Sequence, residues 1–167
     1  MSSEADVTRT REISVVADFI PPDDQDDEGE ENLAQINLQA LVIATMAYLD
    51  REGLSIDHWI EGVGSIFANH WVPEEFTSSA DVLHEVLRTY RSFGATIDEV
   101  DTEAIPATAT ISGFPDIYLC ELFGMSPHVV ARHNKIVQQI ATAIGYDLTW
   151  RYEEELLHLT VAPHLPR

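Results

Sequence analysis

Apolar residues recur every three or four positions in the first half of the chain, which is the spacing of α-helices. The first such stretch, about residues 33 to 50, follows the potential N-cap Asn32, and its apolar residues lie on nearly all sides. This pattern predicts a helix that is either central to the fold or buried between two subunits. Two more helices are predicted, one after Ser55 and one that starts after Ser78 and stops at Gly94.

The hydrophobic spacing then changes to two, which is typical of half-buried β-strands. Residues 95–101 and 106–112 are predicted to form one hairpin, and residues 146–162 a second. Between them we expect a short helical piece over 116–123 and a longer helix over 126–145. Two hairpins most simply join into a four-stranded antiparallel sheet with helices on one face, so the predicted fold class is α+β.

The N-terminal region differs in composition from the rest. Residues 1–31 contain eleven acidic and two basic residues, and such a segment cannot bury enough apolar surface to fold. We therefore predict a disordered acidic tail over 1–31 and a single domain over 32–167. Residues 12–20 are more apolar than their neighbours, which indicates either a short edge strand or a docking segment that folds onto a partner.

Acidity extends over the whole chain: 29 acidic residues against 9 basic ones give a formal net charge of −20. A surface of this charge repels phosphate backbones, so direct binding to nucleic acid is not expected. Two explanations stay open, adaptation of a whole proteome to salt, or a basic partner toward which the protein acts as an inhibitor or nucleic-acid mimic. Residues 32–167 still hold 18 acidic residues against 7 basic ones, which favours the first.

Cysteine content and the N-terminal sequence indicate a cytoplasmic protein. With one cysteine, Cys120, the chain cannot form an internal disulfide, and the N-terminal sequence lacks the pattern of a signal peptide. The 18 residues between Glu31 and Asp50 are uncharged, but amides in the first half leave too short an apolar run for a membrane span.

Common catalytic motifs for nucleotide, ester and metal-dependent chemistry are missing from the sequence. Cys120 is the one candidate nucleophile, with His128 or His133 on the next predicted helix as its base. The alternative is that Cys120 and His133 are ordinary core residues, because both lie in apolar segments. The spacing of the seven histidines does not favour a metal site, and we expect no cofactor.

Aromatic residues suggest a place for a small apolar ligand between the helices and the sheet. Each of them lies on a periodic apolar face, so the alternative is a role in the core. The predicted pocket residues are Trp59, Phe67, Trp71, Tyr146, Trp150 and Tyr152.

The order of elements over about residues 33 to 162 resembles the vinyl-reductase domain family, whose fold is shared with small vesicle-tethering (TRAPP) subunits. Leu119-Cys120 before the long helix and residues 143–146 before the last hairpin carry the resemblance. It implies a ligand-sensing or assembly domain that is often dimeric. The paired cysteines common near the end of that family are absent, since residues 146–151 contain none.

The sequence thus predicts a non-catalytic cytoplasmic domain that binds a small apolar ligand or forms a homo-oligomer in a regulatory system. A small cysteine-dependent hydrolase or transferase is the alternative from the enzyme classes. An acidic protein that occupies a basic partner is the third hypothesis.

Overall fold

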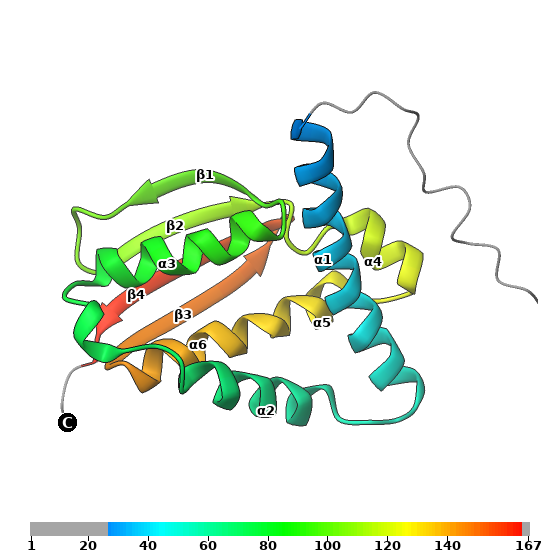
Figure 1. Ribbon diagram of the computed structural model, residues 1–167, viewed down its shortest axis with the longest axis horizontal. Helices are drawn as coiled ribbons and strands as arrows, with labels where there is room; N and C mark the ends of the chain where they lie inside the picture. Colours follow the sequence, from blue (N-terminus) through cyan, green and yellow to red (C-terminus); the bar gives the residue numbers. More distant parts are fainter. Residues whose placement is uncertain (1–26, 165–167) are drawn as a thin grey trace, which may run out of the picture.

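The computed structural model describes residues 27–164, with side chains from Asn32 onward (Figure 1). The predicted docking segment at 12–20 and most of the predicted acidic tail therefore lie outside the described residues. In chain order the elements are α1 (Asp27–Arg51), α2 (Ile56–Ala68), η2 (Pro73–Glu75), α3 (Ser79–Ser92), β1 (Thr96–Asp101), β2 (Ala107–Ser112), α4 (Ile117–Phe123), α5 (Pro127–Ala131), η3 (Arg132–Asn134), α6 (Lys135–Ala143), β3 (Tyr146–Glu153) and β4 (Leu156–Pro163).

The strands form one antiparallel sheet in the order β1-β2-β4-β3. The two hairpins join through β2 and β4, where Ala109 lies opposite Leu159. Along β3, Leu148 and Tyr152 are buried while Asp147 and Thr149 are exposed, which is the alternation that the sequence predicted. The strand order also makes β1 and β3 the two edges of the sheet.

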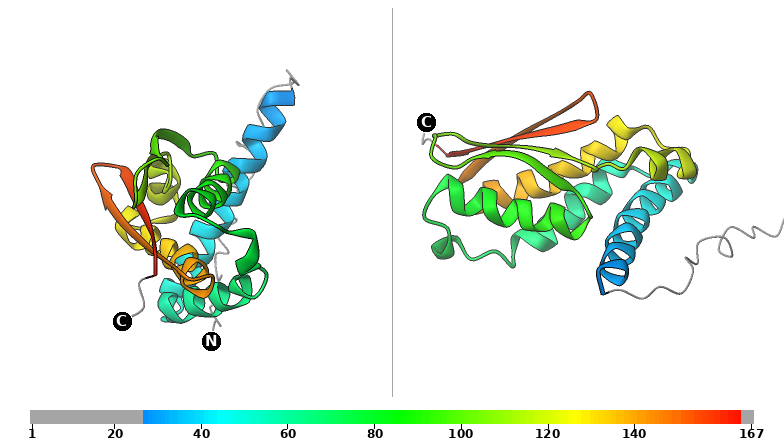
Figure 2. Two further views of the ribbon diagram at one scale, coloured as in Figure 1. Left: turned by 90° about the vertical axis from the view of Figure 1, so that its left-hand side faces the viewer. Right: turned by 90° about the horizontal axis from the view of Figure 1, so that it is seen from above.

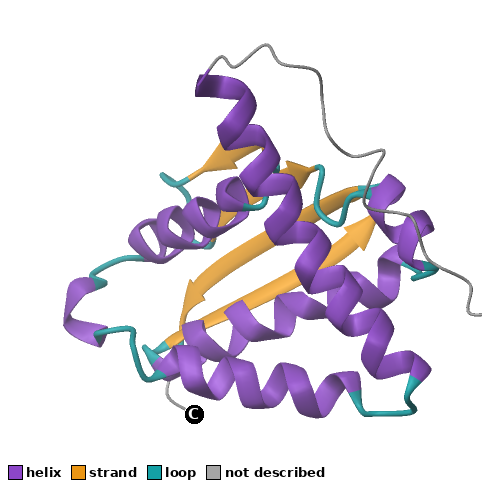
Figure 3. Ribbon diagram, turned by 45° about the vertical axis from the view of Figure 1, so that its right-hand side comes forward, coloured by secondary structure: helices purple, strands orange, loops and turns teal. Residues whose placement is uncertain are grey.

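Helices cover one face of this sheet and leave the other open, as the two views of Figure 2 and the view of Figure 3 show. Buried side chains of α3 and α6 pack on the sheet in the larger of two hydrophobic clusters. A second cluster joins α1, α2, α4 and α6 through residues such as Ile43, Ile60 and Leu119. The predicted α+β fold with helices on one face is confirmed.

Helix α1 begins at Asp27, earlier than predicted, so Asn32 lies inside the helix rather than at its N-cap. Residues 27–31 are mostly acidic, and acidic residues favour the first turn of a helix because they oppose its dipole. Residues 27–31, which the sequence assigned to the disordered tail, therefore belong to the helix.

In addition to the apolar packing of α1, one buried polar side chain links this helix to the ends of α3 and β2. Buried Gln39 donates hydrogen bonds from Nε2 to the carbonyl oxygens of Phe93, at 2.9 Å, and of Gly113, at 3.1 Å. Its Oε1 accepts a bond of 2.6 Å from the backbone N–H of Asp116, the N-cap of α4. Because both the nitrogen and the oxygen of the amide are hydrogen-bonded, burial of Gln39 leaves no polar atom without a partner.

The prediction of one continuous helix over 126–145 was wrong. The structure instead has α5, a 3₁₀ turn (η3) and α6 in succession. Asn134 in this turn is fully buried; its Nδ2 donates to the carbonyl of Ala131 at 2.6 Å, and its Oδ1 accepts from the Tyr90 hydroxyl. Asparagine side chains that bond nearby backbone compete with regular helix, which explains the interruption.

Candidate functional site

Cys120 lies fully buried on α4, in the cluster between α1 and α2. Burial raises the pKa of its thiol to about 11, with the negative charge of Asp116 adding to the shift. A thiol with so high a pKa is protonated near neutral pH and is a weak nucleophile. The environment therefore suits the core role better than the catalytic one.

The two candidate histidines, His133 and His128, have different neighbours. His133 is buried among aromatic rings, with centroid distances of 5.7 Å to both Phe93 and Phe114, and burial lowers its pKa to about 4. His128 is exposed on α5 and meets the ring of Tyr152 edge-on at 5.3 Å. Among the described residues no hydrogen bond joins Cys120 to either histidine, so the structure shows no nucleophile–base pair.

The six predicted pocket aromatics lie in different parts of the molecule. Trp71 stacks on Phe76 at 5.0 Å, and the hydroxyl of Tyr146 donates to the Phe76 carbonyl at 3.4 Å, so these two predicted residues share a neighbour. Trp59 instead lies 6.3 Å from the ring of His133. They do not line one common cavity among the cavities that the structure describes.

The other three predicted aromatics sit on α2 and β3. Tyr152 is buried and its hydroxyl has no hydrogen-bond partner in the described structure, while Trp150 is half-buried against the sheet cluster. Phe67 is 53% exposed, so its assignment to a buried apolar face was wrong. Helix α2 ends at Ala68, so Phe67 lies in its last turn.

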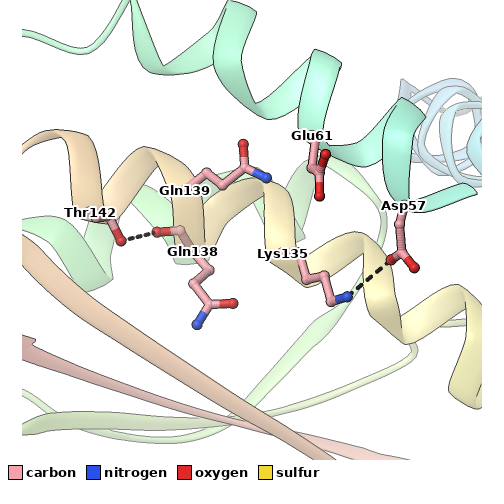
Figure 4. Close-up of a pocket in the computed structure, with 6 residues that line it drawn as sticks. All are labelled: Asp57, Glu61, Lys135, Gln138, Gln139 and Thr142. Carbon is pink, nitrogen blue, oxygen red and sulfur yellow. Dashed lines mark hydrogen bonds and ion pairs between the residues drawn. The ribbon is translucent and has the colours of Figure 1, made fainter.

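Two open hollows occur in the described part of the chain. The larger, about 690 Å³, lies along the solvent side of α3 and includes Trp71 and Phe76 among mainly charged side chains. The smaller, about 360 Å³, lies between α2 and α6 and has the lining shown in Figure 4: Asp57, Glu61, Lys135, Gln138, Gln139 and Thr142. Both are open and lined mainly by polar or charged residues, whereas pockets for apolar ligands are lined predominantly by hydrophobic side chains.

An ion-pair cluster forms one end of the smaller hollow. Asp57 accepts from Lys135 Nζ at 3.0 Å and from Arg132, and these hydrogen bonds, that of Arg132 first, lower the pKa of the Asp57 carboxyl. The sequence did not indicate this cluster, because Asp57 and Lys135 are 78 positions apart. The cluster has two cations against one carboxylate. The rest of the lining is acidic Glu61 and the neutral polar side chains of Gln138, Gln139 and Thr142.

Exposed apolar side chains form a stripe on α1. For this helix the sequence predicted either a central position in the fold or burial between two subunits. Leu38 is 41% exposed, Leu41 64% and Tyr48 55%, with half-buried Thr45 between them. We call these four residues the α1 stripe. Because their spacing is three, four and three, they lie on one side of the helix, opposite the buried Ile43.

Within α1 the stripe lies in an uncharged stretch, although the adjoining helix α4 contains the exposed Glu121. No charged residue occurs between positions 32 and 49, although the chain as a whole has a net charge of −20. The neighbouring helix α4 adds two exposed apolar side chains, Tyr118 and Leu122. The N-terminal turns of α1 also extend beyond the body of the molecule (Figures 1 and 2).

In the described residues no group of three or more histidine, cysteine and acidic side chains could hold a metal ion. Among the described helices, none has both the length and the hydropathy for crossing a bilayer.

Comparison of the chain with protein-family models, curated proteins and solved structures found no match in any of the three. The resemblance to the vinyl-reductase domain family therefore stays a prediction. The arguments about function below depend on the residues and contacts of this chain alone.

Proposed function

We propose that this chain is a non-catalytic, cytoplasmic regulatory domain that acts as a homodimer, with α1 of each copy in the interface. The observation that carries the proposal is the α1 stripe: exposed apolar side chains aligned along the uncharged part of the helix, residues 32–49. Single exposed apolar residues are common on proteins, whereas an aligned row of them is typical of an interaction surface.

Burial of these side chains against a partner is favourable. Each buried Å² of apolar surface contributes roughly 25 cal/mol, and a leucine or tyrosine side chain that becomes fully buried contributes about 2 kcal/mol. Leu41 and Tyr48 both keep more than half of their surface in water in the single chain. A partner helix that covers the stripe would remove this surface from water.

Charge favours a second copy at this face rather than at another. Two molecules of net charge −20 repel each other wherever carboxylates meet, and interface cores are generally depleted in charged residues. Residues 32–49 offer a surface on which two acidic copies can touch without pairing like charges. The proposal centres on the homodimer rather than on an apolar ligand because both described hollows are open and lined mainly by polar or charged residues.

The test is a pair of matched substitutions. Leu41→Glu puts a charge at the centre of the α1 stripe, and Ile66→Glu puts the same charge on α2, where Ile66 is 62% exposed against 64% for Leu41. Because both side chains are mainly in water, both variants should fold. We expect light scattering to show dimers for the wild type and Ile66→Glu, and monomers for Leu41→Glu.

Two results would contradict the proposal. One is a wild-type chain that stays monomeric at every accessible concentration. The other is a Leu41→Glu variant that dimerises as well as Ile66→Glu, because the interface would then lie outside α1.

A further inference from the structure

We infer that the two copies of α1 pack antiparallel, with Leu38 of each copy opposite the partner's Tyr48 and Leu41 opposite the partner's Thr45. This inference rests on the homodimer proposed above and adds the orientation and register of the pair. Three features of the chain support it: the spacing of the stripe, the charges at the two ends of α1, and the shape of the molecule.

The spacing of the α1 stripe is the same in both directions. The steps from Leu38 to Leu41, Thr45 and Tyr48 are three, four and three residues, so the row is symmetric about position 43. Such steps follow the a and d positions of two-helix packing. A twofold axis at position 43 therefore aligns the row with itself when the second helix runs in the opposite direction.

Charges at the ends of α1 favour that direction. The sequence of the first turns, residues 27–31, contains four acidic residues, and Asp50, Arg51 and Glu52 follow the uncharged stretch at the other end. Parallel helices would place two acidic starts side by side. Antiparallel helices instead place each acidic start beyond the partner's residues 50–52, whose net charge is only −1, so the repulsion is smaller. They also align the helix dipoles favourably.

The shape of the molecule agrees with this arrangement. The N-terminal turns of α1 extend beyond the body, whereas its C-terminal half leads into α2 within the body (Figures 1 and 2). In the antiparallel register, positions 35–42 lie along the C-terminal half of the partner's α1, and the first turns extend past its end at Arg51. The two bodies then lie at opposite ends of the helix pair, which separates two strongly acidic surfaces.

Disulfide trapping tests the orientation. The chains to compare are Leu38→Cys, Tyr48→Cys and the variant with both changes, oxidised under mild conditions and separated without reductant. In the antiparallel register the two copies of position 38 lie about 15 Å apart along the axis, while positions 38 and 48 face each other. Cross-linking needs Cα atoms within about 7 Å, so we expect the double variant to give about tenfold more linked dimer than either single variant.

The wild-type chain is the matched control. Cys120 is buried, so it should give no linked dimer under the same oxidation. Sedimentation of each reduced variant shows whether the substitution itself changes the mass of the assembly. Leu38 and Tyr48 are both largely exposed, and their replacement leaves the core intact.

The possible outcomes distinguish an error in the helix orientation from an error in the proposed dimer. Single variants that link as fully as the double variant indicate parallel helices, which overturns this inference and leaves the homodimer standing. Dimers that link in none of the variants place the interface elsewhere and overturn the register. Reduced wild-type chains that sediment as monomers overturn the proposed function and this inference with it.

Discussion

Two adjacent serines at the start of α3 have opposite roles in stability. The Oγ of Ser78 accepts a hydrogen bond of 3.2 Å from the Asp81 N–H and caps the helix, whereas the buried Oγ of Ser79 has no partner in the described structure. We predict that Ser78→Ala lowers the free energy of unfolding by about 1 kcal/mol. Ser79→Ala should leave it unchanged or raise it, because the substitution removes an unsatisfied polar group.

Urea denaturation of the two variants beside the wild type measures both effects. A larger loss for Ser79→Ala than for Ser78→Ala would show that the capping interpretation is mistaken.

His133 predicts a dependence of stability on pH. Burial lowers its pKa to about 4 in the folded chain, against about 6.5 when unfolded, so the unfolded state binds the proton more tightly. The contribution of His133 is thus complete above about pH 6.5 and is lost as the pH falls toward 4. Over this window the wild type should lose up to ~3 kcal/mol more stability than His133→Gln does.

The measurement is the free energy of unfolding of both chains at several pH values between about 4 and 7. Exposed His84 gives the control, because His84→Gln should keep the wild-type slope. Equal slopes for the wild type and His133→Gln would mean that the imidazole is not kept neutral by burial.

Local signals explain which residues the sequence could predict. The caps at Ser55 and Ser78 and the stop at Gly94 follow from residue type and neighbouring pattern, and the structure confirms them. The contact of Asp57 with Lys135 depends on how α2 meets α6, which no local pattern encodes. For the same reason the sequence could not tell that Phe67 would be exposed.

At the scale of elements, α2 and α6 meet closely at Gly64. A Cβ added there would lie 2.4 Å from Oε1 and 3.4 Å from Cβ of Gln139, whereas one added at Gly62 would meet nothing within 4 Å. Both glycines are in the same helix, where glycine costs roughly 1 kcal/mol relative to alanine. We predict that Gly62→Ala raises the free energy of unfolding by about 0.5–1 kcal/mol, and that Gly64→Ala raises it less because the Gln139 side chain must move.

Thermal or chemical denaturation of the two alanine variants measures both changes in the free energy of unfolding. A gain at Gly64 equal to that at Gly62 would mean that the contact between α2 and α6 has room for a methyl group.

The elements that the sequence predicted well have strong internal periodicity. Both hairpins, α3 and α4 fall within a few residues of their predicted bounds, because their alternation and caps are local. The break between α5 and α6 was not predicted: Asn134 is buried there and also accepts a bond from Tyr90, 44 positions away, which no local pattern encodes. Periodicity also left open whether α1 lies at the centre of the fold or between two subunits. A helix in either position has apolar residues on nearly all sides.

At the scale of the whole molecule, acidity opposes the proposed dimer. Each copy has a net charge of −20, while the α1 stripe contributes no ion pair that salt could weaken. Because added salt screens repulsion between the bodies, we predict that the dissociation constant of the dimer falls by about tenfold between about 0.05 and 0.5 M NaCl.

Sedimentation at several salt concentrations measures this dependence. A dissociation constant that rises with salt would contradict the prediction, because an interface held by opposite charges behaves in that way.

The central claim is that the α1 stripe is buried between two copies of the chain. Sedimentation equilibrium of the full wild-type chain at moderate salt tests it most directly. We predict a mass twice that of the 18.7 kDa chain, with dissociation on dilution. A mass of one chain at every concentration would contradict the account, because the exposed leucines and tyrosine of α1 would then face water in the native protein.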